Sequence, residues 1–142
     1  MRMFIINVQS PEYRQVLYLR NEVLRKPLGL ILSEKDIEND SNEWILIAKK
    51  NEDVVASVQL RLLSDRQIKL RQMVVDVNFQ SKGYGRRLLQ FAEQTAREKS
   101  YDSIVLHART SAIGFYQKAG YQIVSKEFME VGIPHYKMEK QL

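Results

Sequence analysis

The sequence predicts an α/β fold in which a mixed, mostly antiparallel central sheet of about seven strands is flanked by helices. Three apolar segments separated by short polar turns predict an antiparallel meander. The strands of this meander are expected at about 44–49, 54–63 and 68–76. A helical pattern at about 84–99 then leads to a buried apolar strand at about 103–107. Such a strand–helix–strand crossover joins parallel strands, so the sheet must be mixed.

The N-terminal third begins with an apolar strand at about 3–8 and continues into a helix at about 11–26. Pro11 suits a first helical turn, where a missing N–H costs nothing. Apolar residues recur at helical spacing in this segment: Val16, Leu17, Leu19, Val23 and Leu24. Residues 27–43 are polar and irregular, and we expect a loop there with one short helix.

The C-terminal half carries two further helices and the last strands. The helix at about 84–99 presents one apolar face, made by Leu88, Leu89, Ala92, Thr95 and Ala96. A short helix is expected at about 112–119, with Gly120 at the position that favours glycine after a helix end. Two final strands, at about 121–128 and 135–141, flank the segment Gly132-Ile133-Pro134.

Composition limits the classes of protein to consider. The 142 residues, 44% hydrophobic and 27% charged, are typical of one globular domain that spans residues 1–142. No apolar run is long enough to cross a membrane, and the absence of cysteine excludes disulfides and a cysteine nucleophile. These features indicate a cytoplasmic protein. The net charge of +5 is compatible with an anionic cofactor.

The most informative segment is Gln80–Gly85, which lies between an expected strand and an expected helix. Its two glycines allow a tight turn and a close approach of a ligand to the backbone. Free N–H groups at the following helix N-terminus favour an anion. A dinucleotide fingerprint would need a third glycine where Leu88 stands, and no Gly-Lys-Ser/Thr follows. The segment therefore predicts a pocket for a phosphate-bearing cofactor of another kind.

Two motifs in this order of elements resemble the GNAT superfamily of N-acetyltransferases. Gln80, Gly83 and Gly85 match the family's turn, which reads Gln or Arg, two residues, Gly, one residue, then Gly or Ala. About 30 residues on, the segment Ala112–Tyr121 is similar to the family's A-x-x-F-Y-x-K-x-G-[FY] pattern. The tetrapeptide Gly132-Ile-Pro-His135 resembles the ElaA-like subgroup.

The resemblance implies an acetyl-CoA-dependent N-acetyltransferase. The cofactor's pyrophosphate would lie on the glycine turn, and its pantetheine arm would pair with the strand that precedes it. The residues expected to bind acetyl-CoA are therefore Met73, Val74, Val75, Gln80, Ser81, Lys82, Gly83, Tyr84, Gly85, Arg86, Arg109 and Tyr116. At Arg109 family members often carry an Asn that helps hold the cofactor arm, so this contact departs from the family's pattern.

Tyr116 matches the family's tyrosine that protonates the departing CoA thiolate. The acceptor amine would attack directly, because the chain has no cysteine for an acyl-enzyme. A base must take the amine's proton, and Glu130, His135 and His107 are the candidates. The two histidines are far apart in the sequence, with no carboxylates at ligand spacing, so no metal site is expected.

The expected partner is a small-molecule or peptide amine, and a homodimer fits the family. Two other classes stay open at this point. One is a catalytically silent acyl-CoA-binding or partner-binding domain. The other is a nucleic-acid binder, which we do not expect because Arg and Lys are spread along the chain without a basic stripe. The fold does not choose among the amines that such enzymes acetylate.

Overall fold

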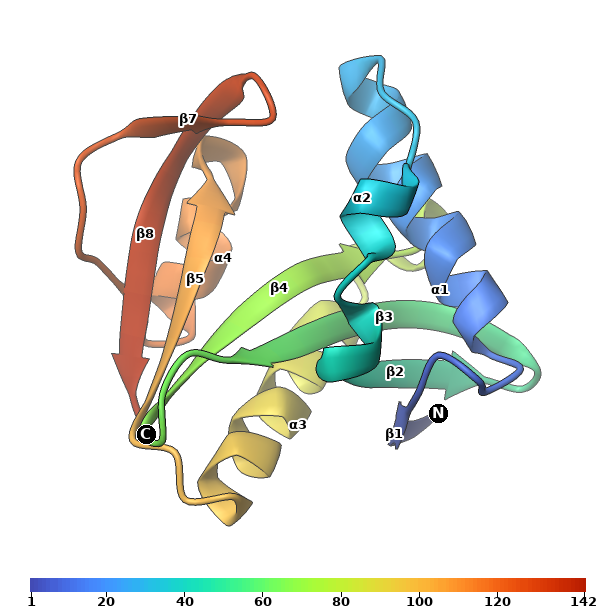
Figure 1. Ribbon diagram of the computed structural model, residues 1–142, viewed down its shortest axis with the longest axis horizontal. Helices are drawn as coiled ribbons and strands as arrows, with labels where there is room; N and C mark the ends of the chain where they lie inside the picture. Colours follow the sequence, from blue (N-terminus) through green and yellow to red (C-terminus); the bar gives the residue numbers. More distant parts are fainter.

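Eight strands form one sheet in the computed structural model, which describes all 142 residues (Figure 1). The strands are β1 (Arg2–Ile6), β2 (Trp44–Lys50), β3 (Asp53–Leu62), β4 (Gln67–Val75), β5 (Ser103–Arg109), β6 (Gln122–Ile123), β7 (Phe128–Glu130) and β8 (Ile133–Gln141). They lie in the order β1-β2-β3-β4-β5-β8-β6, and β7 also pairs with β8. Only β4 and β5 pair in parallel. The mixed, mostly antiparallel α/β sheet is thus confirmed.

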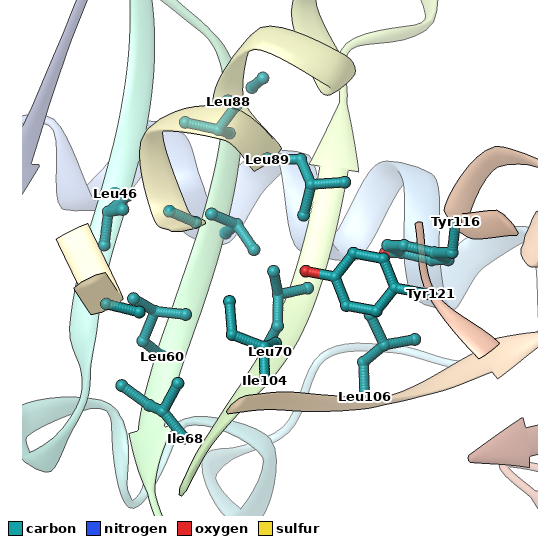
Figure 2. Close-up of a cluster of buried hydrophobic side chains, with 14 of the residues drawn as sticks. Leu46, Leu60, Ile68, Leu70, Leu88, Leu89, Ile104, Leu106, Tyr116 and Tyr121 are labelled. Atoms are coloured by element: carbon teal, nitrogen blue, oxygen red, sulfur yellow. The ribbon is translucent and has the colours of Figure 1, made fainter. Parts of the chain in front are cut away.

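Helices cover both faces of the sheet. The long helix α3 (Tyr84–Glu98) and the short helix α4 (Ile113–Lys118) pack on one face, over a core of 18 buried residues. Leu88, Leu89 and Tyr116 come from these helices and meet Leu70 and Leu106 of the sheet (Figure 2). On the other face, α1 (Tyr13–Leu19) packs over a second cluster of seven residues. Side chains alternate between the faces of a strand, so each strand contributes to both layers.

The helix expected at about 11–26 changes type along its length. It begins as α1, continues as a π-helix at Arg20–Arg25 and ends in a 3-10 turn at Lys26–Leu28. Arg20 and Arg25 are both buried. In an α-helix, residues five apart lie on different faces, so the wider π turn is what lets both arginines point inward.

A buried charge network attaches this helical segment to the sheet. The Arg20 guanidinium donates to Asp40 at 2.6 Å, to the Gln59 side chain at 3.0 Å and to the backbone carbonyl of Asp36. Asp36 lies in the short helix α2 (Glu34–Ile37), which Ser33 caps, and Asp40 begins a 3-10 turn at Asp40–Asn42. The prediction of a loop with one short helix at 27–43 is therefore close to the structure.

The last strands differ from the prediction. The single strand expected at about 121–128 is instead two short strands, β6 and β7, and Val124–Glu127 belong to neither. Between them, the Ser125 hydroxyl rather than a backbone carbonyl accepts from the amide of Lys137. The following strand begins earlier than expected, at Ile133, so the presumed Gly-Ile-Pro loop is instead a tight hairpin turn at Val131-Gly132, where both φ angles are positive.

The strands β4 and β5 pair over only part of their length. Their register runs from Gln67–Ser103 to Leu70–Leu106, and beyond these residues no pairs form. Figure 1 shows the two strands meeting near the C-terminus and diverging toward their other ends. One edge of β4 therefore has no strand partner after Leu70.

A β-bulge lies in the unpaired part of β4. Gln72 has φ of 55°, and Gln72 and Met73 together face the single residue Val58 of β3. The extra residue resets the alternation of side chains, so that Met73 and Val75 pack on the core of the α3 face and Val74 on the α1 face. No helix in the structure is long and apolar enough to span a membrane.

Candidate active site between the diverging strands

A cavity of about 340 Å³ occupies the space where β4 and β5 part. Its walls come from both strands, from the π-helix and from the β7–β8 hairpin. Of the residues predicted from the sequence, Met73, Arg109, Tyr116, Glu130, His135 and His107 line it. The glycine turn and Val74–Val75 do not line it, and they lie farther along the chain from the end of the strand pairing.

The two faces of the cavity differ in chemistry. Leu70, Leu106 and Ala108 belong to the apolar core that α3 and α4 cover, and Tyr116 belongs to the same cluster. The residues between them, such as Lys69, His107 and Arg109, point to the opposite side because strand residues alternate. One face is therefore apolar with a phenol, and the other is polar and charged.

The glycine turn has the backbone geometry of an anion cradle. Ser81 has φ of 62° and Gly83 has φ of 86°, both in the left-handed region. The Gln80 side chain closes the turn by donating to the backbone carbonyl of Val75 at 3.0 Å. No hydrogen bond occupies the first amides of α3, those of Tyr84, Gly85 and Arg86, and no side chain caps this helix. These N–H groups remain free for a ligand.

The two glycines of the turn do different things. A Cβ on Gly83 would meet no atom within 4 Å, so this side of the turn is open to an approaching molecule. A Cβ on Gly85 would come within 3.3 Å of the Val75 side chain and 3.6 Å of the Phe115 ring. Gly85 therefore allows α3 to pack closely on β4 and α4. Lys82 and Arg86 are both exposed, and Lys82 lies over the Phe79 ring.

Tyr116 is buried in α4 and borders the cavity. Its ring packs between those of Phe115 and Tyr121. No protein group forms a hydrogen bond with its hydroxyl, whereas the hydroxyl of neighbouring Tyr121 donates to Glu93 at 2.9 Å. Burial raises the pKa of the Tyr116 phenol, so it stays protonated over a wide range of pH.

The three base candidates lie together, although 28 residues separate them in the sequence. Glu130, at the end of β7, has one carboxylate oxygen 2.9 Å from His107 Nδ1 and the other 3.6 Å from His135 Nε2. Partial burial opposes ionisation, but the hydrogen bond from His107 and the nearby His135 and Lys69 hold the pKa of Glu130 below its usual value. The carboxylate is therefore ionised at neutral pH.

The partners of each histidine fix its protons. His107 Nδ1 faces the Glu130 carboxylate and must donate to it, which leaves Nε2 as the ring's acceptor. His135 Nδ1 lies 2.9 Å from the Ile133 carbonyl and donates there, and His135 is buried inside β8 rather than beside a loop. No group of three or more His, Asp or Glu side chains is arranged to hold a metal ion.

Arg109 joins two elements across the cavity. Its guanidinium donates to the backbone carbonyl of Leu24, in the π-helix, at 2.9 Å. Burial and the nearby charge of Arg25 lower the pKa of Arg109, and Glu130 partly opposes this. The side chain therefore ties the end of β5 to the helical segment and keeps a positive charge at the cavity wall.

Sequence reasoning did not identify most of the charged residues that line the cavity. Arg25, Arg61, Lys69 and Arg71 line the cavity, and none was singled out from the sequence. One signal was present: Lys69 and Arg71 alternate with Ile68 and Leu70 in a strand expected to be central, which places two cations on one face. The contributions of Arg25 and Arg61 come from other elements and have no such signal.

The mixed sheet, with two parallel strands that part and a glycine turn between β4 and α3, matches in fold the structures of acyl-CoA N-acyltransferases. Residues 22–142 match the family described as an acetyltransferase (GNAT) domain. The chain belongs to the GNAT acetyltransferase family.

Relatives and solved structures agree with this assignment. The chain is 30% identical over 139 residues to the Bacillus subtilis N-acetyltransferase YjcF, which covers 96% of this chain and 97% of that protein. It is similar in fold to Escherichia coli ElaA, with a TM-score of 0.85 and 20% identity over 99% of both chains. A GNAT acetyltransferase from Elizabethkingia anophelis, solved with acetyl-CoA bound, has a TM-score of 0.77 and 20% identity over 99% of this chain and 97% of that one.

Proposed function

We propose that this protein transfers an acetyl group from acetyl-CoA to a primary amine, which attacks the thioester directly. The observation that carries the proposal is the cavity between β4 and β5, where a free tyrosine hydroxyl and a glutamate–histidine pair line one space. A relative named as an N-acetyltransferase and a structural neighbour solved with acetyl-CoA support the choice of reaction and cofactor.

The cofactor is assigned to the α3 and α4 face. Its pyrophosphate would accept from the free amides at the start of α3, with Lys82 and Arg86 adding positive charge. Its pantetheine arm would lie along the edge of β4 that lacks a strand partner, where Met73, Val74 and Val75 offer backbone groups. At the Gln72 bulge, a backbone amide would donate to the thioester carbonyl. This amide would stabilise the negative charge that develops on the carbonyl oxygen.

Each proton has an assigned place in the reaction. The neutral amine attacks the carbonyl carbon of the thioester, the new C–N bond forms and the C–S bond breaks. The amine's proton passes to the Glu130–His107 pair, and the departing thiolate takes the proton of Tyr116. Within the pair we assign the accepting atom to His107 Nε2, because Glu130 holds the proton on Nδ1 and is itself too weak a base.

His135 completes this arrangement without facing the amine. It is buried, and its Nε2 lies nearest the second oxygen of Glu130. We assign it to positioning Glu130, which in turn orients His107. The sequence-based assignment of Glu130 and His135 to the base is thereby refined to a cluster in which His107 is the acceptor.

Calorimetric titration of the purified protein with acetyl-CoA, beside free CoA, tests the cofactor first. We expect one-to-one binding with a micromolar dissociation constant for both. A panel of amines, read by release of the CoA thiol, then tests the reaction. Binding without turnover on any amine would favour a silent acyl-CoA-binding domain. No binding up to millimolar acetyl-CoA would overturn the proposal.

A further inference from the structure

Five cationic side chains converge on the face of the cavity away from α3 and α4. They come from three strands and the π-helix: Arg25, Arg61, Lys69, Arg71 and Arg109. The carboxylates near them are fewer, because Glu43 pairs with both Arg61 and Arg71, Asp36 pairs with Arg25, and Glu130 is the remaining one. The wall therefore carries an excess of positive charge.

The excess is concentrated on two side chains. Neither Lys69 nor Arg109 has a carboxylate within salt-bridge distance. The Lys69 ammonium has one marginal contact, with His107 Nδ1 at 3.5 Å, and Arg109 donates to a neutral carbonyl. Both are half-buried at the cavity wall. Partly buried cations without a counter-ion are unusual, since desolvation disfavours the charge.

The environment of Lys69 shows this cost. Burial lowers the pKa of Lys69, and the charges of Arg71 and Arg61 lower it further, against the opposing charge of Glu130. Burial and Arg25 act in the same way on Arg109. An anion bound at this wall, beside Lys69 or Arg109, would relieve the effect on that side chain and replace the hydration that it has lost.

The phosphates of the cofactor are not the anion that this wall suits best. Strand alternation puts Lys69 and Arg109 on the face opposite Leu70, Leu106 and Ala108, which α3 and α4 cover. The glycine turn and the free amides of α3, assigned to the pyrophosphate, come after the end of β4 and do not line the cavity. The charged wall therefore remains for the second substrate.

We propose that the wall formed by Lys69 and Arg109 binds an anionic group of the acceptor, so that the acceptor is a small amine that also carries a carboxylate or a phosphate. The inference rests on the proposed function. Lys69 contacts His107, and His107 contacts Glu130, so the anion site adjoins the proton-accepting pair. The anionic group and the amine must then be only a few bonds apart. Polyamines and other polycations are disfavoured, because five cations would face them.

Matched acceptors test the charge directly. β-Alanine and n-propylamine have similar chain lengths and similar amines, and phosphoethanolamine and ethanolamine form a second pair. A hydrogen-bonded charge pair contributes about 1.5–3 kcal/mol, so we expect kcat/KM to be at least about ten-fold higher for the charged member of one pair. The pair that shows the preference distinguishes a carboxylate from a phosphate. Equal kcat/KM values within both pairs would overturn the proposal.

Variants then locate the effect. Lys69→Gln and Arg109→Gln should each raise KM for the preferred anionic acceptor and narrow the difference within its pair, while the dissociation constant of acetyl-CoA stays within about two-fold. Lys126→Gln, which removes an exposed lysine without an ion pair, is the matched control and should change neither value. Weaker acetyl-CoA binding in Lys69→Gln and Arg109→Gln, with an unchanged acceptor preference, would assign the wall to the cofactor and refute the proposal.

Binding of a product analogue provides a readout that does not depend on turnover. N-Acetyl-β-alanine, N-acetylphosphoethanolamine and the uncharged N-propylacetamide are titrated into the free protein and into its CoA complex. We expect at least one anionic product to bind and the uncharged one not to, with binding lost in Lys69→Gln. Failure of both anionic products to bind, in a protein that does bind acetyl-CoA, would refute the anion site and leave the proposed function intact. Failure of acetyl-CoA itself to bind would refute the proposed function instead.

Discussion

The two faces of the sheet around the cavity are built by different physical means. The α3 and α4 face depends on close apolar packing and on backbone conformation. Gly83 has a left-handed conformation, Gly85 allows close packing, and the first amides of α3 are free. On the α1 face, an apolar cluster of seven residues is joined by a buried charge network that links Arg20, Asp40 and Gln59. The first face is the one to which we assign acetyl-CoA, the ligand bound in a structural neighbour.

The buried network of the charged face offers the largest effect. Asp40→Ala would remove the carboxylate that pairs with the fully buried Arg20 and would leave that cation unpaired. Breaking a buried ion pair in this way costs about 3–5 kcal/mol in the free energy of unfolding. Urea denaturation measures this loss, and Glu38→Ala, at an exposed position nearby without an ion pair, should show almost none.

The double variant Arg20→Met with Asp40→Leu sharpens the test. Because it removes both charges at once, its stability should recover a large part of the loss seen for Asp40→Ala.

On the apolar face, no second substitution can rescue Leu88→Ala in this way. This variant should lower the free energy of unfolding by about 2–5 kcal/mol through the cavity it leaves. A loss for Asp40→Ala below about 1 kcal/mol would contradict the idea that charges hold the α1 face.

The second largest effect concerns the phenol of the apolar face. Tyr116→Phe should lower kcat about 100-fold, the lower end of the usual contribution of a general acid. The dissociation constant of acetyl-CoA and the stability should hardly change, because the hydroxyl has no protein partner to lose. Stopped-flow or steady-state measurement of thiol release gives kcat, and calorimetry gives the dissociation constant.

Tyr121→Phe is the matched control for this substitution. The two rings lie 5.6 Å apart in the same cluster, but the Tyr121 hydroxyl donates to buried Glu93. Its loss should therefore lower stability by about 1 kcal/mol and leave kcat unchanged. Equal kcat values for Tyr116→Phe and the unmodified protein would exclude Tyr116 as the acid.

The glycine turn gives a smaller effect, on cofactor binding. Gly83→Ala places a Cβ at a position with φ of 86°, which costs about 1 kcal/mol, and directs it into the space assigned to the cofactor. Gly29→Ala meets the same strain at φ of 74° and also has open space around it, but it lies outside the turn. We expect acetyl-CoA affinity about ten-fold lower in Gly83→Ala only. Equal affinities in the two variants would show that Gly83 serves the backbone alone.

The contrast between the faces also explains what could be predicted from the sequence. The glycine turn and the Tyr116 segment are contiguous, so their residues and their spacing are visible in the chain itself. Helix α3 and the meander follow from hydrophobic periodicity, which depends on neighbours in sequence. The bounds of these helices and strands agree closely with the prediction, and the elements contribute to the apolar face.

The charged face could not be predicted in the same way, because its residues meet only after folding. His107 and Glu130 come from different strands and lie 2.9 Å apart only because β5, β7 and β8 pair side by side. The π-helix buries both Arg20 and Arg25, whose side chains bind partners on β3 and α2. Local sequence propensity carries no information about these partners. In the break between β6 and β7, likewise, the Ser125 hydroxyl contacts Lys137, which is 12 residues away in the sequence.

The pH dependence of kcat is the finest test of the difference between the faces. Burial raises the pKa of Tyr116 above its ordinary value of about 10, so the acid form persists to higher pH than an exposed phenol would allow. The acid limits the rate only when it loses its proton, so kcat should not fall between neutral pH and about pH 10. A falling limb near pH 9 that disappears in Tyr116→Phe would mean that the phenol is not desolvated in the working enzyme. The apolar face would then be open to water, and the division of the cavity into a dry side and a charged side would fail.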